Sequence, residues 1–225
     1  MSSTPLVRFD ASDAVSGEPV PCLVRRLLIA GYTGRDQEQV HQHVRELADL
    51  GVPPPDSIPA FYEVPASLLT WSDGIETDGA ETSGEAELVL FTTARGWYVG
   101  LGSDHTDRSL ERTSISAAKA ACPKPVSAVV LPVAAVTNRW DALVLRSQAG
   151  GSPYQEAPLA TILPLDDIVD GCRRSMGEPL DDVALFMGTV PLLDGAFRYS
   201  EQFRAELWDG DRLLLACSYH VTRRS

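Results

Sequence analysis

Three acidic side chains in one region of the sequence have a spacing that suits a metal ion. Glu85 and Glu87 lie in a stretch expected to form a strand, where residues two apart point to the same side with Cα atoms ~6.5 Å apart. A turn at residues 94–96 leads to a second expected strand, residues 97–101, and Asp104 follows it. If the second strand folds back beside the first, the three carboxylates form the all-oxygen environment that Mg²⁺ or Mn²⁺ prefers.

A simpler interpretation of the same three residues stays open at this point. Glutamates at alternate strand positions are common on a solvent-exposed sheet face. Asp104 precedes an expected short helix, so its carboxylate could instead cap the helix N-terminus. The spacing alone does not choose between a metal site and these structural roles.

A second group of chemically useful residues lies on the clearest predicted helix, residues 34–50. His43 and Glu46 are three residues apart, which makes them neighbours on the helix surface. A carboxylate that fixes one imidazole tautomer makes the other ring nitrogen a better acceptor of a proton from water, which is the work of a general base. The helix is rich in charged and amide side chains, so an ordinary solvated face explains the pair at least as well.

The rest of the pattern describes the elements that must position these residues. Apolar or alternating runs predict strands, glycine stops predict helix ends, and Asp-Gly-Asp at residues 209–211 predicts a hairpin. We expect one domain over residues 21–225, preceded by an N-terminal extension or edge strand over residues 1–20. The expected strands are residues 6–9, 22–30, 60–64, 140–147, 183–187, 203–208 and 212–219, and the expected second helix is residues 165–176.

The composition excludes several classes of partner. The chain has 225 residues, of which 44% are apolar and 22% charged, as in an ordinary globular protein. Its formal charge of -12 argues against nucleic acid or an anionic membrane surface, because either would require clustered lysine and arginine. An acidic protein still binds a small anion where a metal ion reverses the local field.

Several familiar sites are missing from the sequence. The four cysteines are scattered without zinc-like spacing to the four histidines, so we interpret them as reduced thiols. No Gly-x-Ser-x-Gly elbow, His-Glu-x-x-His motif, Walker loop or complete dinucleotide-binding fingerprint occurs. The N-terminus has no signal-peptide pattern and no apolar run reaches the length of a membrane span, so the cytoplasm is the expected compartment.

Two lysines, Lys119 and Lys124, stand out in an otherwise uncharged segment of small residues. A lysine beside apolar residues either extends its ammonium to the surface or presents it to a pocket, and the first arrangement is the commoner one.

Taken in order, several short motifs resemble the C-terminal catalytic domain of the fumarylacetoacetate hydrolase superfamily. The resemblance covers roughly residues 27–221, which is most of the chain. It consists of a Glu-x-Glu-Leu strand, an aspartate turn before a short helix, a lysine segment, a leucine-rich strand with a glycine turn and a glutamine, a Gly-Thr-Pro-like loop, and a His-x-x-Glu pair. These are similar, in that order, to residues 84–90, 102–108, 119–123, 143–155, 182–191 and 43–46.

The resemblance implies an α+β, mostly β fold, a mixed β-roll or sandwich with a few peripheral helices, and often a homodimer. It implies a Mg²⁺ or Mn²⁺ ion held by Glu85, Glu87 and Asp104. The implied function is a divalent-metal-dependent hydrolase that cleaves a C–C bond in a 2-oxo acid or acylpyruvate-like dicarbonyl compound.

The resemblance also implies a role for each remaining site residue. His43, oriented by Glu46, would activate water, and Lys119 would offset developing negative charge. The Gly188 amide and the Thr189 hydroxyl would hold a substrate carboxylate. A weaker expectation is that Gln155 orients the substrate.

This sequence departs from the family pattern near the substrate. Residues 61–65 replace a common Lys-Pro, and Leu192, Leu193 and Asp194 replace the usual glycines after an insertion before Pro191. Two other functions therefore stay open. One is a metal-dependent decarboxylase, isomerase or dehydratase that works through an enolate without attacking water, and the other is a non-catalytic small-molecule-binding protein on the same fold.

Overall fold

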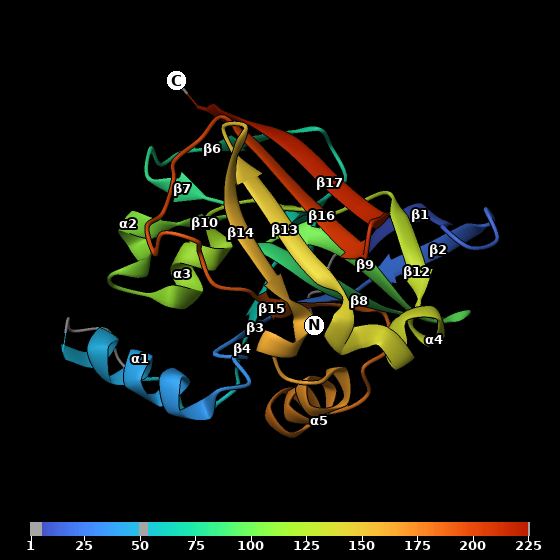
Figure 1. Cartoon of the computed structure of the whole chain (residues 1–225), viewed down its shortest axis with the longest axis horizontal. Helices are drawn as coiled ribbons and strands as arrows, with labels where there is room; N and C mark the ends of the chain where they lie inside the picture. The colour runs from blue at the N-terminus through green and yellow to red at the C-terminus, as the bar shows by residue number, and fades with distance from the viewer. Residues whose placement is uncertain (1–5, 50–53, 225) are drawn as a thin grey trace.

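The protein, described here by a computed structural model, is built mainly from two β-sheets (Figure 1). The description covers residues 6–49 and 54–224, and the side chains of His43 and Leu47 lie outside it. The larger sheet has eight strands in the order β2-β1-β12-β9-β8-β15-β3-β4. In that order they are Pro19–Val24, Val7–Asp13, Val129–Pro132, Gly96–Ser103, Ala86–Thr93, Val183–Thr189, Arg26–Gly31 and Ala60–Val64.

The second sheet has five strands in the order β14-β13-β16-β17-β6 and lies over one face of the first (Figure 1). These strands are Ser152–Pro158, Val144–Ala149, Gln202–Asp209, Arg212–Arg223 and Gly74–Thr77. Two short strand pairs, β10 with β7 and β11 with β5, connect the sheets to the helices. Their bounds are Thr106–Asp107, Thr82–Ser83, Lys124–Pro125 and Leu69–Thr70.

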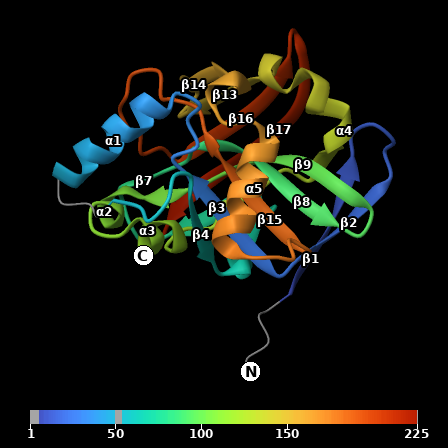
Figure 2. The ribbon, with the colours of Figure 1, turned by 90° about the horizontal axis from the view of Figure 1, so that it is seen from below.

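The helices are peripheral. Figure 2 shows α5 (Leu165–Met176) against the end of the large sheet that holds β4, where Gly171 faces Phe61. The other α-helices are α1 Gln37–Asp49, α2 Arg108–Glu111, α3 Ile115–Ala120 and α4 Val133–Val136, and 3₁₀ turns occupy Ala66–Leu68, Thr137–Ala142 and Leu159–Thr161. No helix among the described residues is long and apolar enough to cross a membrane.

The large sheet is buried on both faces, which explains its continuous apolar sequence. On β3, Leu28 and Ala30 pack into the core shared with the five-stranded sheet, whereas Leu27 and Ile29 pack into a second core on the opposite face. Because strand side chains alternate, a strand between two cores needs apolar residues at every position. The predicted α+β, mostly β architecture is confirmed.

Some predicted boundaries are wrong. Residues 22–30 are divided between two strands: residues 22–24 end β2, residues 26–30 begin β3, and Arg25 lies between them. Residues 7–9 belong to β1, which pairs with β2 on one side and β12 on the other, so it is an interior strand of the large sheet. Neither an edge strand nor a separate extension describes this segment. The 3₁₀ turn at Thr137–Ala142 replaces the first part of the strand expected over residues 140–147.

Candidate functional site

A β-hairpin places the backbones of the three predicted ligand residues close to one another. β8 and β9 pair antiparallel with Glu87 opposite Gly102, so Glu87 lies near the start of one strand while Asp104 directly follows the other. The Asp104 amide donates a hydrogen bond of 3.0 Å to the carbonyl of Glu85, which precedes β8. Asp104 and Glu87 are 0% and 2% exposed, so neither belongs to a solvated face.

Asp104 does not cap the short helix that follows it. The N-cap of α2 is Asp107, whose carboxylate accepts hydrogen bonds from the amides of Ser109 (2.9 Å) and Leu110 (3.0 Å). The Asp104 carboxylate faces two buried ammonium groups instead.

Both of those ammonium groups come from Lys119 and Lys124, which are the only lysines in the chain. Lys119 Nζ donates a short hydrogen bond to Asp104 Oδ2, and Lys124 Nζ lies 3.2 Å from Asp104 Oδ1. Burial alone would raise the pKa of Asp104, but the two ammonium groups outweigh it and hold that pKa below its usual range. Asp104 is therefore an anion fixed between two cations.

The two lysines have different surroundings. Burial would lower the pKa of Lys119, but the charges of Asp104, Glu87 and Glu85 raise it above its usual value. For Lys124, burial prevails and lowers the pKa, although Asp104 opposes it. Lys124 Nζ also donates to the His105 carbonyl at 2.5 Å. The charge of Lys119 is therefore stabilised by all three carboxylates, whereas Lys124 contacts Asp104 and the His105 carbonyl.

Glu87 is held by a bulge in the neighbouring strand. The register between β15 and β8 shifts between Phe186 and Thr189. At this bulge the Gly188 amide donates a hydrogen bond of 2.9 Å to Glu87 Oε2. Gly188 has a φ of 92°, and a Cβ there would lie 1.7 Å from Thr33 Oγ1, so only glycine fits. Burial, followed by the charge of Asp104, raises the pKa of Glu87 well above its usual value.

Glu85 is paired with a buried guanidinium. Arg108 Nη2 lies 2.9 Å from Glu85 Oε2, and Arg108 Nη1 lies 2.8 Å from Glu111 Oε2. Arg108 Nε donates to Ser83 Oγ at 2.7 Å, and the Phe197 ring covers the guanidinium at 4.0 Å. Arg108 thus fixes the third carboxylate in place.

Gln155 and Thr189 are hydrogen-bonded within the scaffold. Gln155 Oε1 accepts from the Ala86 amide (2.9 Å) and Ser147 Oγ (2.8 Å). Its Nε2 donates to Thr189 Oγ1 and the Val190 carbonyl, both at 2.7 Å, and Thr189 Oγ1 donates to the Ala86 carbonyl at 2.8 Å. These groups and the Gly188 amide position β8, and their predicted contacts with substrate stay predictions.

Sequence reasoning missed a buried histidine network beside Asp104. His105 contacts the Tyr219 hydroxyl through Nδ1 (2.9 Å) and the Thr82 hydroxyl through Nε2 (3.0 Å), and Tyr219 donates to Ser103 Oγ at 2.9 Å. Burial, helped by the charges of Lys124 and Arg108, lowers the pKa of His105 to about 3. His105 is therefore a neutral structural partner at pH 7.

Tyr62 is a second omission. Its ring centroid lies 5.9 Å from Lys119 Nζ, in the segment that replaces the Lys-Pro of the resembling family. Burial raises the pKa of Tyr62 to about 12, so its phenol stays protonated. No motif predicted either Tyr62 or the partner of His105, because both contacts join residues that are distant in sequence.

The donor set fits a hard divalent cation in its chemistry. Three carboxylates act on the Lys119 ammonium, and Asp104 Oδ1 is a buried oxygen that accepts no hydrogen bond. Burial first, and then the charge of Asp104, raises the pKa of Glu87, and a nearby cation would favour its ionised form. No three His, Cys, Asp or Glu side chains already converge as metal ligands anywhere in residues 6–49 or 54–224. In this structure the Lys119 ammonium supplies positive charge to the three carboxylates.

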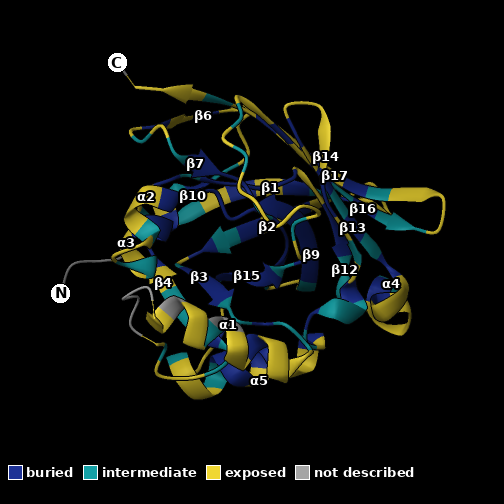
Figure 3. Cartoon of the chain, turned by 60° about the vertical axis from the view of Figure 1, so that its left-hand side comes forward, coloured by how far each residue is buried: buried dark blue, intermediate teal, exposed yellow. Residues whose placement is uncertain are grey.

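Of the predicted water-activating pair, the structure describes the Glu46 side chain alone. Helix α1 exposes most of its described side chains, as Figure 3 shows, and its one buried residue among them is Val40. Glu46 is exposed and accepts a 2.9 Å hydrogen bond from Gln42. The His43 side chain lies outside the described residues, so its role stays a prediction.

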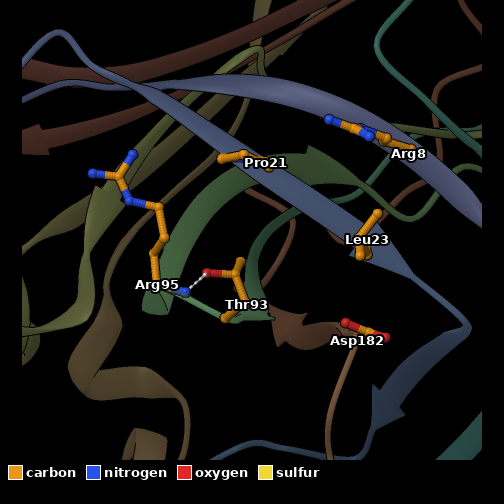
Figure 4. Close-up of a pocket in the computed structure, with 7 residues that line it drawn as sticks. Arg8, Pro21, Leu23, Thr93, Arg95 and Asp182 are labelled. Carbon is orange, nitrogen blue, oxygen red and sulfur yellow. Dashed lines mark hydrogen bonds between the residues drawn. The ribbon is translucent and has the colours of Figure 1, made fainter.

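A shallow surface pocket lies between β1, β2 and the β8–β9 turn (Figure 4). Its lining residues include Arg8, Leu23, Arg95 and Asp182, and the Arg95 amide donates to Thr93 Oγ1 at 3.1 Å. None of its lining residues belongs to the carboxylate cluster, and we assign it no function.

The fold has close counterparts among solved structures. Fumarylpyruvate hydrolase from Pseudomonas aeruginosa, solved with Mn²⁺ and pyruvate, superimposes with a TM-score of 0.68 at 18% identity, covering 98% of each chain. A yeast fumarylacetoacetate hydrolase family protein gives 0.65 at 15% identity, covering 89% of this chain and 94% of its own. The 5-carboxymethyl-2-hydroxymuconate delta-isomerase of Mycobacterium smegmatis gives 0.64 at 14%, covering 91% and 81%.

These structures confirm that the chain has the fumarylacetoacetate hydrolase fold. No curated protein matches it in sequence. The model of the family DUF2848, described as a protein of unknown function, matches residues 30–219. The chain therefore belongs to the DUF2848 family, on a fumarylacetoacetate hydrolase fold.

Proposed function

We propose that this protein is a divalent-metal-dependent enzyme that acts on a 2-oxo acid or an acylpyruvate-like dicarbonyl compound, and that hydrolysis of a C–C bond is its reaction. The observation that carries the proposal is that the buried Glu87 and Asp104 and the partly buried Glu85 all stabilise the charge of one ammonium group, that of Lys119. Glu85 is paired with Arg108 and Asp104 with the two lysines, whereas Glu87 is held by the Gly188 amide. A divalent ion bound among the three carboxylates would supply the positive charge that faces Glu87.

Glu85, Glu87 and Asp104 would hold Mg²⁺ or Mn²⁺. Such an ion, when bound, supplies Lewis-acid stabilisation of the negative charge that develops on a carbonyl oxygen. The similar hydrolase from Pseudomonas aeruginosa contains Mn²⁺ and pyruvate, which supports this ion and this substrate class.

The chain's own residues would supply the rest. The Gly188 amide keeps Glu87 oriented and Arg108 keeps Glu85 oriented, so two ligands are fixed before substrate arrives. Lys119, released from Asp104, would donate a proton or a hydrogen bond to the oxygen on which charge develops. Tyr62, a protonated phenol beside Lys119, would border the same space. His43 and Glu46 would activate the attacking water.

A second reaction class is favoured by the exposure of Glu46. Isomerisation, decarboxylation or dehydration through an enolate uses the buried cluster alone and requires no attacking water. The similar delta-isomerase of Mycobacterium smegmatis supports this class.

A substrate panel tests both reactions. The purified protein is assayed with acylpyruvates, 2-oxo acids and hydroxymuconate-type acids in the presence of Mg²⁺ or Mn²⁺, and again after EDTA treatment. We expect turnover that EDTA abolishes and that Glu87→Gln lacks. If His43→Ala abolishes turnover, the reaction is hydrolysis, and if it spares turnover, the second class is correct. Metal-independent turnover contradicts the role of the metal, and no turnover of any member leaves a non-catalytic binding protein. The expected homodimer is checked by light scattering.

A further inference from the structure

The loop between β15 and β16, residues 190–201, exposes a group of large apolar side chains. Leu193, Phe197 and Tyr199 are 54%, 43% and 49% exposed and lie within seven residues of one another. Single exposed apolar residues are ordinary, whereas a group of them marks a contact surface. The loop also departs from the resembling family, because residues 192–194 replace glycines that are usual there. The apolar group is therefore a feature of this chain rather than of the fold.

This loop is anchored to β14. It runs from β15 past β14 toward α2 (Figure 1). The Leu193 amide donates a hydrogen bond of 2.9 Å to the Tyr154 carbonyl. Arg198 donates to the Pro153 carbonyl through Nη1 (2.9 Å) and to Asp194 Oδ2 through Nη2 (2.7 Å). A loop held in this way presents its side chains to a ligand at little cost in conformational entropy.

Phe197 connects the loop to the carboxylate cluster. Its ring centroid lies 4.0 Å from Arg108 Cζ, and Arg108 Nη2 lies 2.9 Å from Glu85 Oε2. Glu85 is the ligand carboxylate that solvent reaches, since its side chain is 16% exposed whereas Glu87 and Asp104 are 2% and 0% exposed. A molecule that enters at Glu85 therefore passes the exposed part of the Phe197 ring.

On this basis we propose that Phe197 determines substrate specificity by packing against a bulky apolar group, such as a phenyl ring, at the end of the substrate away from its 2-oxo acid. The inference rests on the proposed function and adds the chemical class of the substrate's distal part. Buried apolar surface stabilises such a contact, and offset stacking of two rings adds to it. The contact with Arg108, next to Glu85, favours the substrate over a second copy of the chain as the occupant.

Two ligands that differ only in the apolar group test this. Pyruvate and phenylpyruvate are titrated into the full chain with saturating Mg²⁺, and their binding is measured by isothermal titration calorimetry. We expect phenylpyruvate to bind at least about tenfold more tightly than pyruvate, because its ring leaves water for the Phe197 surface. Equal affinities in the wild-type protein overturn the proposal.

The variant Phe197→Ala isolates the ring. We expect the preference for phenylpyruvate to fall below about threefold, while the affinity for pyruvate changes less than about twofold. An equal loss of affinity for both ligands would mean that the ring serves only to cover Arg108, and that result overturns the proposal.

Tyr199→Ala is the matched control, because it removes a similarly exposed ring two residues along the loop and leaves the ring over Arg108 in place. We expect it to keep the wild-type preference within about twofold. If Tyr199→Ala reduces the preference as much as Phe197→Ala does, the effect belongs to the loop as a whole and the specific role of Phe197 is wrong.

The remaining outcomes separate this inference from the function on which it rests. If neither ligand binds, or if EDTA leaves pyruvate binding unchanged, the proposed function fails and this inference fails with it. If pyruvate binding requires Mg²⁺ but phenylpyruvate binds no better, only the role of Phe197 fails. Light scattering tests the second copy as occupant: if Phe197→Ala and Tyr199→Ala both dissociate a dimer and keep the wild-type preference, the loop is a subunit contact and the proposal is overturned.

Discussion

The buried carboxylate cluster and helix α1 carry the two halves of the proposed chemistry, and they are built in opposite ways. Every ionised group of the cluster has a charged or hydrogen-bonded partner fixed by a strand end or a short helix. Helix α1 exposes nearly all its described side chains. The comparison teaches that the cation site depends on the fold, whereas a water-activating group on α1 could change without disturbing the core.

Asp104→Asn should have the largest effect, because it leaves two buried ammonium groups without their anion. We expect a loss of about 3–5 kcal/mol in the free energy of unfolding, measured by denaturant titration, and loss of Mn²⁺ binding. Asp141→Asn is the control, since it breaks an exposed pair with Arg35 and should leave the unfolding midpoint nearly unchanged. Equal midpoints for the two variants would refute the description of the cluster.

Gly188→Ala should have the next largest effect. The new Cβ meets Thr33 Oγ1 in a backbone conformation with a φ of 92°, so we expect a loss of about 3 kcal/mol in the free energy of unfolding. Gly195→Ala also has a positive φ, but nothing lies within 4 Å, and it should cost about 1 kcal/mol. A smaller loss for Gly188→Ala than for Gly195→Ala would contradict the close packing of the bulge.

The buried His105 predicts a pH dependence of stability. Its pKa is lowered to about 3, so below pH 6.5 the unfolded chain takes up a proton that the folded chain refuses. Stability is complete above pH 6.5 and falls by up to about 1.4 kcal/mol per pH unit as the pH drops toward 3. Glu87, with its raised pKa, acts in the opposite sense. The informative quantity is therefore the difference in the free energy of unfolding between the wild type and His105→Gln at each pH.

That difference is obtained from denaturant unfolding at a series of pH values between 6.5 and 4. Above this range His105→Gln should show a constant loss from its broken hydrogen bonds. Parallel curves for the two proteins throughout the range would mean that His105 does not titrate as described.

Glu46→Gln should have the smallest effect on the fold. Because Glu46 is exposed, we expect the free energy of unfolding to change by less than about 0.5 kcal/mol. If the reaction is hydrolysis, kcat should fall while Mn²⁺ binding is retained, which gives a loss of activity without loss of the site. A large loss of stability would show that α1 is more tightly packed than its exposure indicates.

The sequence predicted the elements with strong local patterns. Helix α5 and the hairpin of β16 and β17 are bounded by glycines and a tight turn, and the predictions nearly match the structure. The boundary between β2 and β3 was missed because a strand buried on both faces has no alternation to mark where it ends. The interior position of β1 follows from its pairing with β12, which lies far away in the sequence.

The same limit applies to the site. Glu85, Glu87 and Asp104 were predictable because strand periodicity and a tight turn are local. The partners that fix their charges were not predictable, because Lys124 follows Asp104 after two short helices, and the usual expectation for a lone lysine is a surface position. The scaffold role of Gln155 depends on contacts with β8 and β15, which no motif encodes.

The last strand, β17, reaches back to the cluster, because the Tyr219 hydroxyl bonds Ser103 and contacts His105. A growing chain therefore exposes Glu87, Asp104 and both lysines long before the residue that completes their surroundings is synthesised. Pairings between such distant residues form slowly, so we expect the site to mature at the end of folding. A nascent chain that stops before residue 219 should hold its strands in a loose state that binds no ion.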